Sequence, residues 1–195
     1  MIFFTSDTHF GGLDTIEREN RPFKNCDKFN KYTIKLWNKQ SGKNDIIYHL
    51  GDFVNYNEKD QISWSNAIRL VKKIKAKVIL IIGNNEERVI KYHFDDNFDK
   101  FRQFCIDLGF QDVKKEEFLE FNNKKFYLNH FPRKHKDGYI NLFGHTHRTT
   151  GVWKPFGLNM GCDLNHFYLY TVDEIERLLE VKNRRWDKDE DNLCM

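Results

Sequence analysis

The sequence opens with Ile2-Phe3-Phe4-Thr5-Ser6-Asp7-Thr8-His9, a short apolar run that ends in a carboxylate and an imidazole. The apolar and β-branched residues of Ile2–Thr5 predict a buried strand. Similar runs later in the chain are also followed within a few residues by Asp, Asn or His. They are Asp45–Leu50, Lys77–Ile82, Lys125–Asn129 and Tyr139–Phe143. In open α/β sheets, ligands bind just beyond the carboxyl ends of the strands, so this repeated ending predicts one site at the strand ends.

Helical patterns separate the early strands. Apolar side chains recur every three or four residues along Cys26–Gln40, Gln61–Ile74 and Asn97–Leu108, which is the spacing of one helix face. The capping-box pattern Thr171-Val172-Asp173-Glu174 predicts a last helix that ends near Val181. Helices are therefore expected both between the early strands and at the end of the chain.

The second half of the chain reads mainly as strands. Weaker strand patterns cover Val113–Phe121 and Leu158–Met160, and Asn122-Asn123 predicts a hairpin turn. Together with the helical segments, this order predicts a layered α/β fold whose first half is largely parallel and whose second half is rich in hairpins.

Length and composition fit one cytoplasmic domain. The chain has 195 residues, enough to bury a core without disulfides, so its four Cys are expected to be reduced. The apolar runs are far shorter than the ~20 residues of a transmembrane helix, and the start lacks a secretory pattern. A net charge of +3 does not by itself predict a nucleic-acid partner. We assign residues 1–183 to the domain and expect the charged residues 184–195 to form a disordered tail.

The polar residues after the strands have the chemistry of metal ligands. Asp7 and His9, like His145 and His147, are separated by one residue, and on extended backbone both members of a pair project to one face. A mixture of carboxylate, imidazole and amide suits first-row transition metals better than Mg²⁺ or Ca²⁺. The full candidate set is Asp7, His9, Asp52, Asn84, His130, His145 and His147. Seven ligands are more than one tetrahedral ion can bind, and they suit two ions that share a carboxylate.

The order of these motifs resembles the calcineurin-like metallophosphoesterase superfamily, in particular its small single-domain bacterial and phage members. The motifs that carry the resemblance are Asp7-Thr8-His9, Gly51-Asp52, Gly83-Asn84, His130 and Gly144-His145-Thr146-His147. Each motif is common by itself, whereas all five in this order at strand ends form a specific pattern. The match extends from Met1 to about Asp163.

The resemblance implies a single-domain four-layer α/β/β/α sandwich with two divalent transition-metal ions, Mn, Fe, Zn or Ni. By motif match, one ion would be held by Asp7, His9 and His147. The other would be held by Asn84, His130 and His145, and Asp52 would bridge the two. The implied activity is phosphoester hydrolysis, in which a metal-bridging hydroxide attacks phosphorus in line.

The sequence departs from the family at one position where the family usually has a catalytic residue. The family usually has His after the Asn of the GN motif, and that His helps to hold the phosphate and to protonate the leaving oxygen. Here Asn85 occupies the position, and an amide can hydrogen-bond a phosphate oxygen but cannot deliver a proton at neutral pH. His135 is a candidate substitute acid. Arg21 is a candidate for substrate binding, since a planar guanidinium recognises phosphate well.

We therefore expect a phosphodiesterase of small phosphorylated substrates such as nucleotides. A phosphomonoesterase, a nuclease acting on nucleic-acid ends and a weakly catalytic metal-binding scaffold for a protein partner are the alternatives. Retention of all seven candidate ligands counts against the scaffold, and the dispersed Lys residues count against a nucleic-acid groove.

Overall fold

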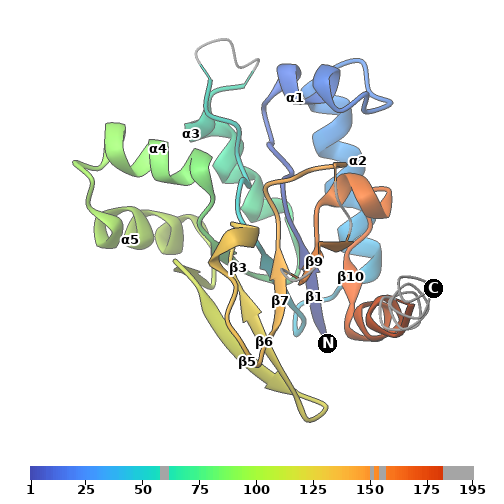
Figure 1. Cartoon of the computed structure of the whole chain (residues 1–195). Coiled ribbons are helices and arrows are strands. Elements are labelled where there is room, and N and C mark those ends of the chain that lie inside the picture. Colours follow the sequence, from blue (N-terminus) through green and yellow to red (C-terminus); the bar gives the residue numbers. More distant parts are fainter. Residues whose placement is uncertain (58–61, 150–151, 154–156, 182–195) are drawn as a thin grey trace, which may run out of the picture.

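The computed structural model describes residues 1–57, 62–149, 152–153 and 157–181, so the predicted tail at 184–195 lies outside the described residues (Figure 1). Its first sheet has the strand order β10-β1-β2-β3-β4. The strands are β1 (Ile2–Thr5), β2 (Ile46–His49), β3 (Lys77–Ile81), β4 (Asp112–Lys114) and β10 (Tyr170–Thr171). Neighbours from β1 to β4 are parallel, as predicted for the first half, and β10 joins β1 antiparallel.

The strand pairing of the second sheet differs from two of the predictions made from the sequence. Its order is β5-β6-β7-β9-β8. The strands are β5 (Glu117–Phe121), β6 (Lys124–Leu128), β7 (Ile140–Phe143), β8 (Val152–Trp153) and β9 (Gly157–Asn159). The predicted hairpin joins β5 to β6, and β8 pairs antiparallel with β9, but β6, β7 and β9 pair in parallel, so hairpins form only part of the second half. The predicted strand Val113–Phe121 is in fact β4 and β5, which belong to different sheets.

Along the chain, helices connect the parallel strands of the first sheet. They are α1 (Leu13–Arg18), α2 (Cys26–Gln40), α3 (Trp64–Ala67) with the 3₁₀ helix η1 (Ile68–Lys73), α4 (Asn84–His93) and α5 (Phe98–Leu108). Short 3₁₀ helices follow at η2 (Pro132–Lys134) and η3 (Cys162–Asn165), and residues 172–181 form the predicted last helix. Among the described residues, no helix has the length and apolarity that crossing a membrane requires.

Local capping explains where two of the predicted helices begin. The Asn25 side chain accepts a hydrogen bond from the Lys28 backbone N–H at the start of α2, and Asn97 does the same for Lys100 at the start of α5. Gly109 ends α5 with φ 116°, a left-handed conformation that glycine adopts without steric cost. These boundaries are therefore set by residues that lie next to them in the chain.

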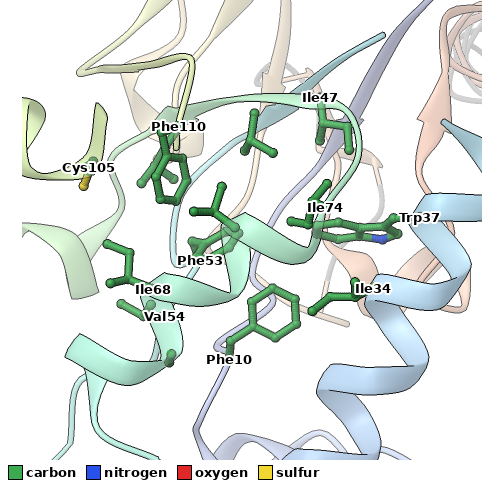
Figure 2. Close-up of a cluster of buried hydrophobic side chains, with 14 of the residues drawn as sticks. Phe10, Ile34, Trp37, Ile47, Phe53, Val54, Ile68, Ile74, Cys105 and Phe110 are labelled. Atoms are coloured by element: carbon green, nitrogen blue, oxygen red, sulfur yellow. The ribbon is translucent and has the colours of Figure 1, made fainter. Parts of the chain in front are cut away.

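The first sheet is buried on both faces. Alternate residues point to opposite sides, so Phe3 and Ile47 pack toward the helices while Phe4 and Tyr48 pack toward the second sheet. Figure 2 shows the core on the helix side, where Trp37 of α2 lies among Phe10, Phe53 and other apolar side chains. The helix at 172–181 adds Ile175 to the core between the sheets. The structure is thus the predicted mixed α/β domain, with two sheets that are rich in parallel pairs.

Candidate metal centre

The seven predicted ligands converge at the carboxyl ends of the strands. A cleft of about 300 Å³ is lined by five of them, and the other two are fully buried. The five are His9, Asp52, Asn84, His145 and His147, and the buried two are Asp7 and His130. Potential ligand atoms of Asp7, His9 and His147 lie within 4.8 Å of one another, and so do those of Asp7, Asp52 and His130.

Asn84 lies within one half of this cluster, and Asp52 connects the two halves. Asn84 Oδ1 lies 3.1 Å from His130 Nε2 and 2.9 Å from His145 Nδ1. Asp52 Oδ2 lies 3.4 Å from His9 Nε2 and 3.7 Å from His130 Nε2. Asp52 is therefore placed between imidazoles that the family pattern assigns to different ions.

The sequence predicts extended backbone at the paired ligands, and this prediction is wrong. Five of the seven have left-handed backbone: Asp7 (φ 58°), His9 (φ 47°), Asp52 (φ 53°), His145 (φ 72°) and His147 (φ 46°). Such conformations are uncommon outside glycine and cost about 1–3 kcal/mol each. The paired side chains reach one site through these tight turns and not through strand alternation. Strain concentrated at predicted ligands is typical of a functional site.

Two glycines allow the strand ends to approach each other closely. Gly51 has φ 94°, and a Cβ at this position would lie 2.4 Å from His130 Nδ1. A Cβ at Gly83 would lie 2.3 Å from Asp52 Oδ1. The glycines of the GD and GN motifs are thus explained by the space that the neighbouring ligands occupy.

Hydrogen bonds fix the tautomers of two buried histidines. His130 Nδ1 lies 2.8 Å from the Leu50 carbonyl oxygen, which only accepts, so Nδ1–H donates and Nε2 faces Asn84 and Asp52. His9 Nδ1 lies 2.9 Å from Asn55 Oδ1, and Asn55 Nδ2 donates to Asp14, which identifies the Asn55 oxygen as the acceptor. Both imidazoles therefore donate from Nδ1 to a protein group and direct Nε2 toward Asp52, which is the arrangement of metal-ligating histidines.

The residues present fit a transition-metal centre. His9 Nε2 is buried and has no hydrogen-bond partner among the described residues, although such atoms are normally satisfied. Burial lowers the pKa of His9 and keeps the ring neutral, which is the form that binds metal. The donor set of imidazole nitrogens and carboxylate and amide oxygens suits Mn, Fe, Zn or Ni better than an all-oxygen shell would.

Glu86 is a buried carboxylate that sequence reasoning missed. It accepts backbone hydrogen bonds from Gly83 (2.9 Å), Asp52 (2.8 Å), Phe53 (2.9 Å) and Val54 (3.3 Å). Burial raises the pKa of this carboxyl to about 7, while the donors from Gly83 and Asp52 act in the opposite direction. Glu86 therefore closes the first turn of α4 and also holds the Asp52 loop. A glutamate at the third position of a helix is the sequence signal that identifies it.

Asn85, which the sequence predicts as a phosphate ligand, lines the cleft and is hydrogen-bonded to Asp52. Its Nδ2 donates to Asp52 Oδ2 over 2.7 Å, its backbone N–H donates to Asp52 Oδ1 over 2.9 Å, and its Oδ1 accepts from the Tyr56 backbone over 3.0 Å. The side chain lines the cleft but is only 5% exposed. In this geometry Asn85 orients the Asp52 carboxylate.

Arg21 does not reach the cleft, contrary to the predicted substrate-binding role. Its guanidinium is buried, forms a bidentate ion pair with Asp163 and donates to the backbone carbonyls of Asp7 and Thr8. Burial opposes ionisation of Asp163, yet contacts with His147 and Arg21 hold the pKa of that carboxyl at about 2. Sequence alone could not separate a buried arginine from a solvated loop arginine.

His135 is not among the residues that line the cleft. It follows η2, and its Nε2 lies 3.8 Å from Asp137 Oδ1. The cleft instead receives Arg18 from α1 and Arg88 from α4, which the sequence analysis did not identify. Arg88 stands four residues after Asn84 in one helix, so the two share a helix face. Recognition of α4 as a helix would have indicated Arg88.

His49 is buried at the end of β2, and its burial predicts how the stability of the protein depends on pH. Its Nε2 lies 2.9 Å from Thr8 Oγ1, and burial lowers its pKa to about 3. Because the unfolded chain takes up a proton near pH 6.5 and the folded chain does not, stability is lost as pH falls below ~6.5 and the loss reaches about 2–3 kcal/mol near pH 4.5. His49→Gln should lose less stability over this range, as measured by urea unfolding at both ends. Parallel pH profiles for the two proteins would contradict the prediction.

Comparisons with known proteins identify the family of this chain. The family model for calcineurin-like phosphoesterases matches residues 1–187. The uncharacterized protein MJ1445 of Methanocaldococcus jannaschii is 29% identical over 189 residues, which cover 92% of this chain and 91% of the relative. The Gene 66 protein of Mycobacterium phage D29 is 24% identical over 197 residues, or 91% of this chain and 95% of the relative.

A solved structure shows the same fold. The protein of unknown function AQ665 from Aquifex aeolicus superposes with a TM-score of 0.62 at 22% identity, and the match covers 91% of this chain and 98% of that one. The family model spans nearly the whole chain, and the strand ends carry the ligand cluster in the order that the family pattern implies. The protein therefore belongs to the calcineurin-like phosphoesterases.

Proposed function

We propose that this phosphoesterase is a dinuclear metal-dependent hydrolase of small phosphodiesters or nucleotides. The observation that carries the proposal is the pair of buried histidines, His9 and His130, which both donate from Nδ1 to protein groups and direct Nε2 toward Asp52. Asp7, His9 and His147 would hold one ion, Asn84, His130 and His145 the other, and Asp52 both. Such ions, when bound, supply an activated water nucleophile and neutralise charge that develops on the phosphoryl oxygens.

The side chains of the cleft suggest how a phosphate would be bound. Arg88 is exposed, lines the cleft and has no ion-pair partner in the described part of the chain, so its guanidinium is available for a phosphate oxygen. Arg18 reaches the same cleft while its Nε donates to Glu19. A cleft of about 300 Å³ favours a small ester over a folded protein substrate.

Among the described residues that line the cleft, every histidine is one of the proposed metal ligands, so none is left to protonate the leaving group. Asn85 stands at the position of the family histidine, and its amide is engaged with Asp52 and Tyr56. A positioned general acid contributes about 10²–10⁴-fold to rate, and its absence matters most for leaving groups of high pKa. Turnover should therefore fall steeply as leaving-group pKa rises, and aryl esters should react far faster than alkyl esters.

A leaving-group series on metal-loaded protein tests this expectation. Mono- and diesters of nitrophenol, phenol and simple alcohols should give a steep dependence in the wild type and a flatter one in Asn85→His. His135→Ala is the matched control, because His135 lies outside the cleft and its loss should leave the slope unchanged. A flat series in the wild type that becomes steep in His135→Ala would show that a substitute acid exists. No hydrolysis of any ester by fully loaded protein would contradict the proposed activity.

A further inference from the structure

A buried ion pair outside the seven predicted ligands lies between two of their loops. Arg21 Nε and Nη2 donate to Asp163 Oδ1 and Oδ2, each over 2.8 Å, and neither side chain is exposed to solvent. A bidentate pair of this kind fixes orientation as well as distance. A buried ion pair gives little net stability over apolar packing, so stability alone does not explain its presence here.

Arg21 holds the backbone of the first ligand loop. Its Nη1 donates to the Thr8 carbonyl over 2.7 Å and its Nη2 to the Asp7 carbonyl over 2.8 Å. The left-handed backbone of Asp7 and His9 persists only where the surroundings hold it. The arginine therefore supports the turn that brings both side chains to the centre.

Asp163 contacts the other loop. Its Oδ2 lies 3.7 Å from His147 Nδ1, and Glu19 Oε1 lies 3.6 Å from the same nitrogen. A carboxylate on this side of an imidazole favours the proton on Nδ1 and leaves Nε2 free for a metal. The charge of Asp163 thus acts on the ring of His147, while its position is fixed by Arg21.

We infer that Arg21 and Asp163 are positioning residues for one of the two ions, the one assigned to Asp7, His9 and His147. This inference rests on the proposed dinuclear centre. Among the described residues, the pair makes no hydrogen bond to the side chains assigned to the other ion, which are Asn84, His130 and His145. Loss of the Arg21–Asp163 pair should therefore weaken the binding of the two ions unequally.

Cobalt titration of the metal-free full-length chain tests this selectivity. Calorimetry and the visible d–d absorption of Co²⁺ should resolve two binding steps in the wild type. Asp163→Asn keeps the shape of the side chain but removes its charge, and it should weaken one step by about 10–100-fold while the other changes less than about twofold. Arg21→Lys keeps the charge but loses the bidentate geometry, and it should weaken the same step.

A partly exposed ion pair elsewhere in the chain provides a control for loss of an Arg–Asp pair as such. Arg102 and Asp112 are also paired over 2.8 Å, between α5 and β4, so Asp112→Asn should leave both steps unchanged. For a variant of low stability, the melting temperature with and without Co²⁺ tests the same selectivity. The increase in melting temperature contributed by one ion should persist, and that contributed by the other should be lost.

Each possible outcome bears on the inference. Unchanged binding of both ions in Asp163→Asn, or equal weakening of both, would overturn it while leaving the proposed function intact. A wild-type chain that binds fewer than two Co²⁺ ions would reject the dinuclear centre and this inference with it. The two failures are therefore distinguishable.

Discussion

Replacing Asp52 with Asn should lower turnover by about 10²–10⁴-fold, since removal of the shared carboxylate weakens a contribution of several kcal/mol to the transition state. Asp52 Oδ2 lies 3.4 Å from His9 Nε2 and 3.7 Å from His130 Nε2, so one carboxylate serves both halves of the proposed centre. Asn has nearly the same shape but no charge. Steady-state kinetics on a nitrophenyl ester, together with elemental analysis of the purified variant, measures the effect.

The comparison variant for Asp52 is His147→Ala. His147 is assigned to one ion only, so its loss should remove one metal equivalent, whereas Asp52→Asn should reduce both. Near-native turnover in Asp52→Asn, together with loss of turnover in His147→Ala, would show that the bridging assignment is wrong. Wild-type protein with only trace metal, and no gain in activity on addition of Mn, Fe, Zn, Ni or Co, would contradict the metal centre as a whole.

Replacing Glu86 with Ala should cost the largest amount of stability of any single change considered for this chain. The substitution leaves the buried N–H groups of Gly83, Asp52, Phe53 and Val54 without their acceptor. Each buried donor left unsatisfied costs about 1–3 kcal/mol, and with partial relaxation of the loop we expect a total of about 3–5 kcal/mol. At about 2–4 °C per kcal/mol for a chain of this size, the melting temperature should fall by roughly 6–20 °C.

Two variants make the Glu86 result interpretable. Glu87→Ala removes the neighbouring glutamate, which is exposed, and should change the melting temperature by no more than about 1–2 °C. Glu86→Gln keeps one carbonyl oxygen as an acceptor and should lie between the wild type and the Ala variant. Equal melting temperatures for Glu86→Ala and Glu87→Ala would show that the four backbone hydrogen bonds contribute little.

Several features of this protein were determined by sequence close to where they act. The α2 helix has the predicted bounds Cys26–Gln40, because periodic apolar residues and the Asn25 cap lie within or next to the segment itself. The Asn122-Asn123 turn formed the predicted hairpin, because both residues tolerate the positive φ that it requires. The polar residues at the strand ends met in one cleft, because strands of both sheets end on the side that carries it.

Tertiary structure alone decided how those residues are held. The buried place of Arg21 depends on Asp163, which is 142 residues away, and the role of Asn85 depends on Asp52 and Tyr56. The parallel pairing of β6, β7 and β9 depends on a crossover between strands that lacks the pattern of a long helix. Local periodicity reports which face of a segment is apolar. It carries no information about which distant partner satisfies a buried charge or a strained turn, because those energies arise only when the chain is folded.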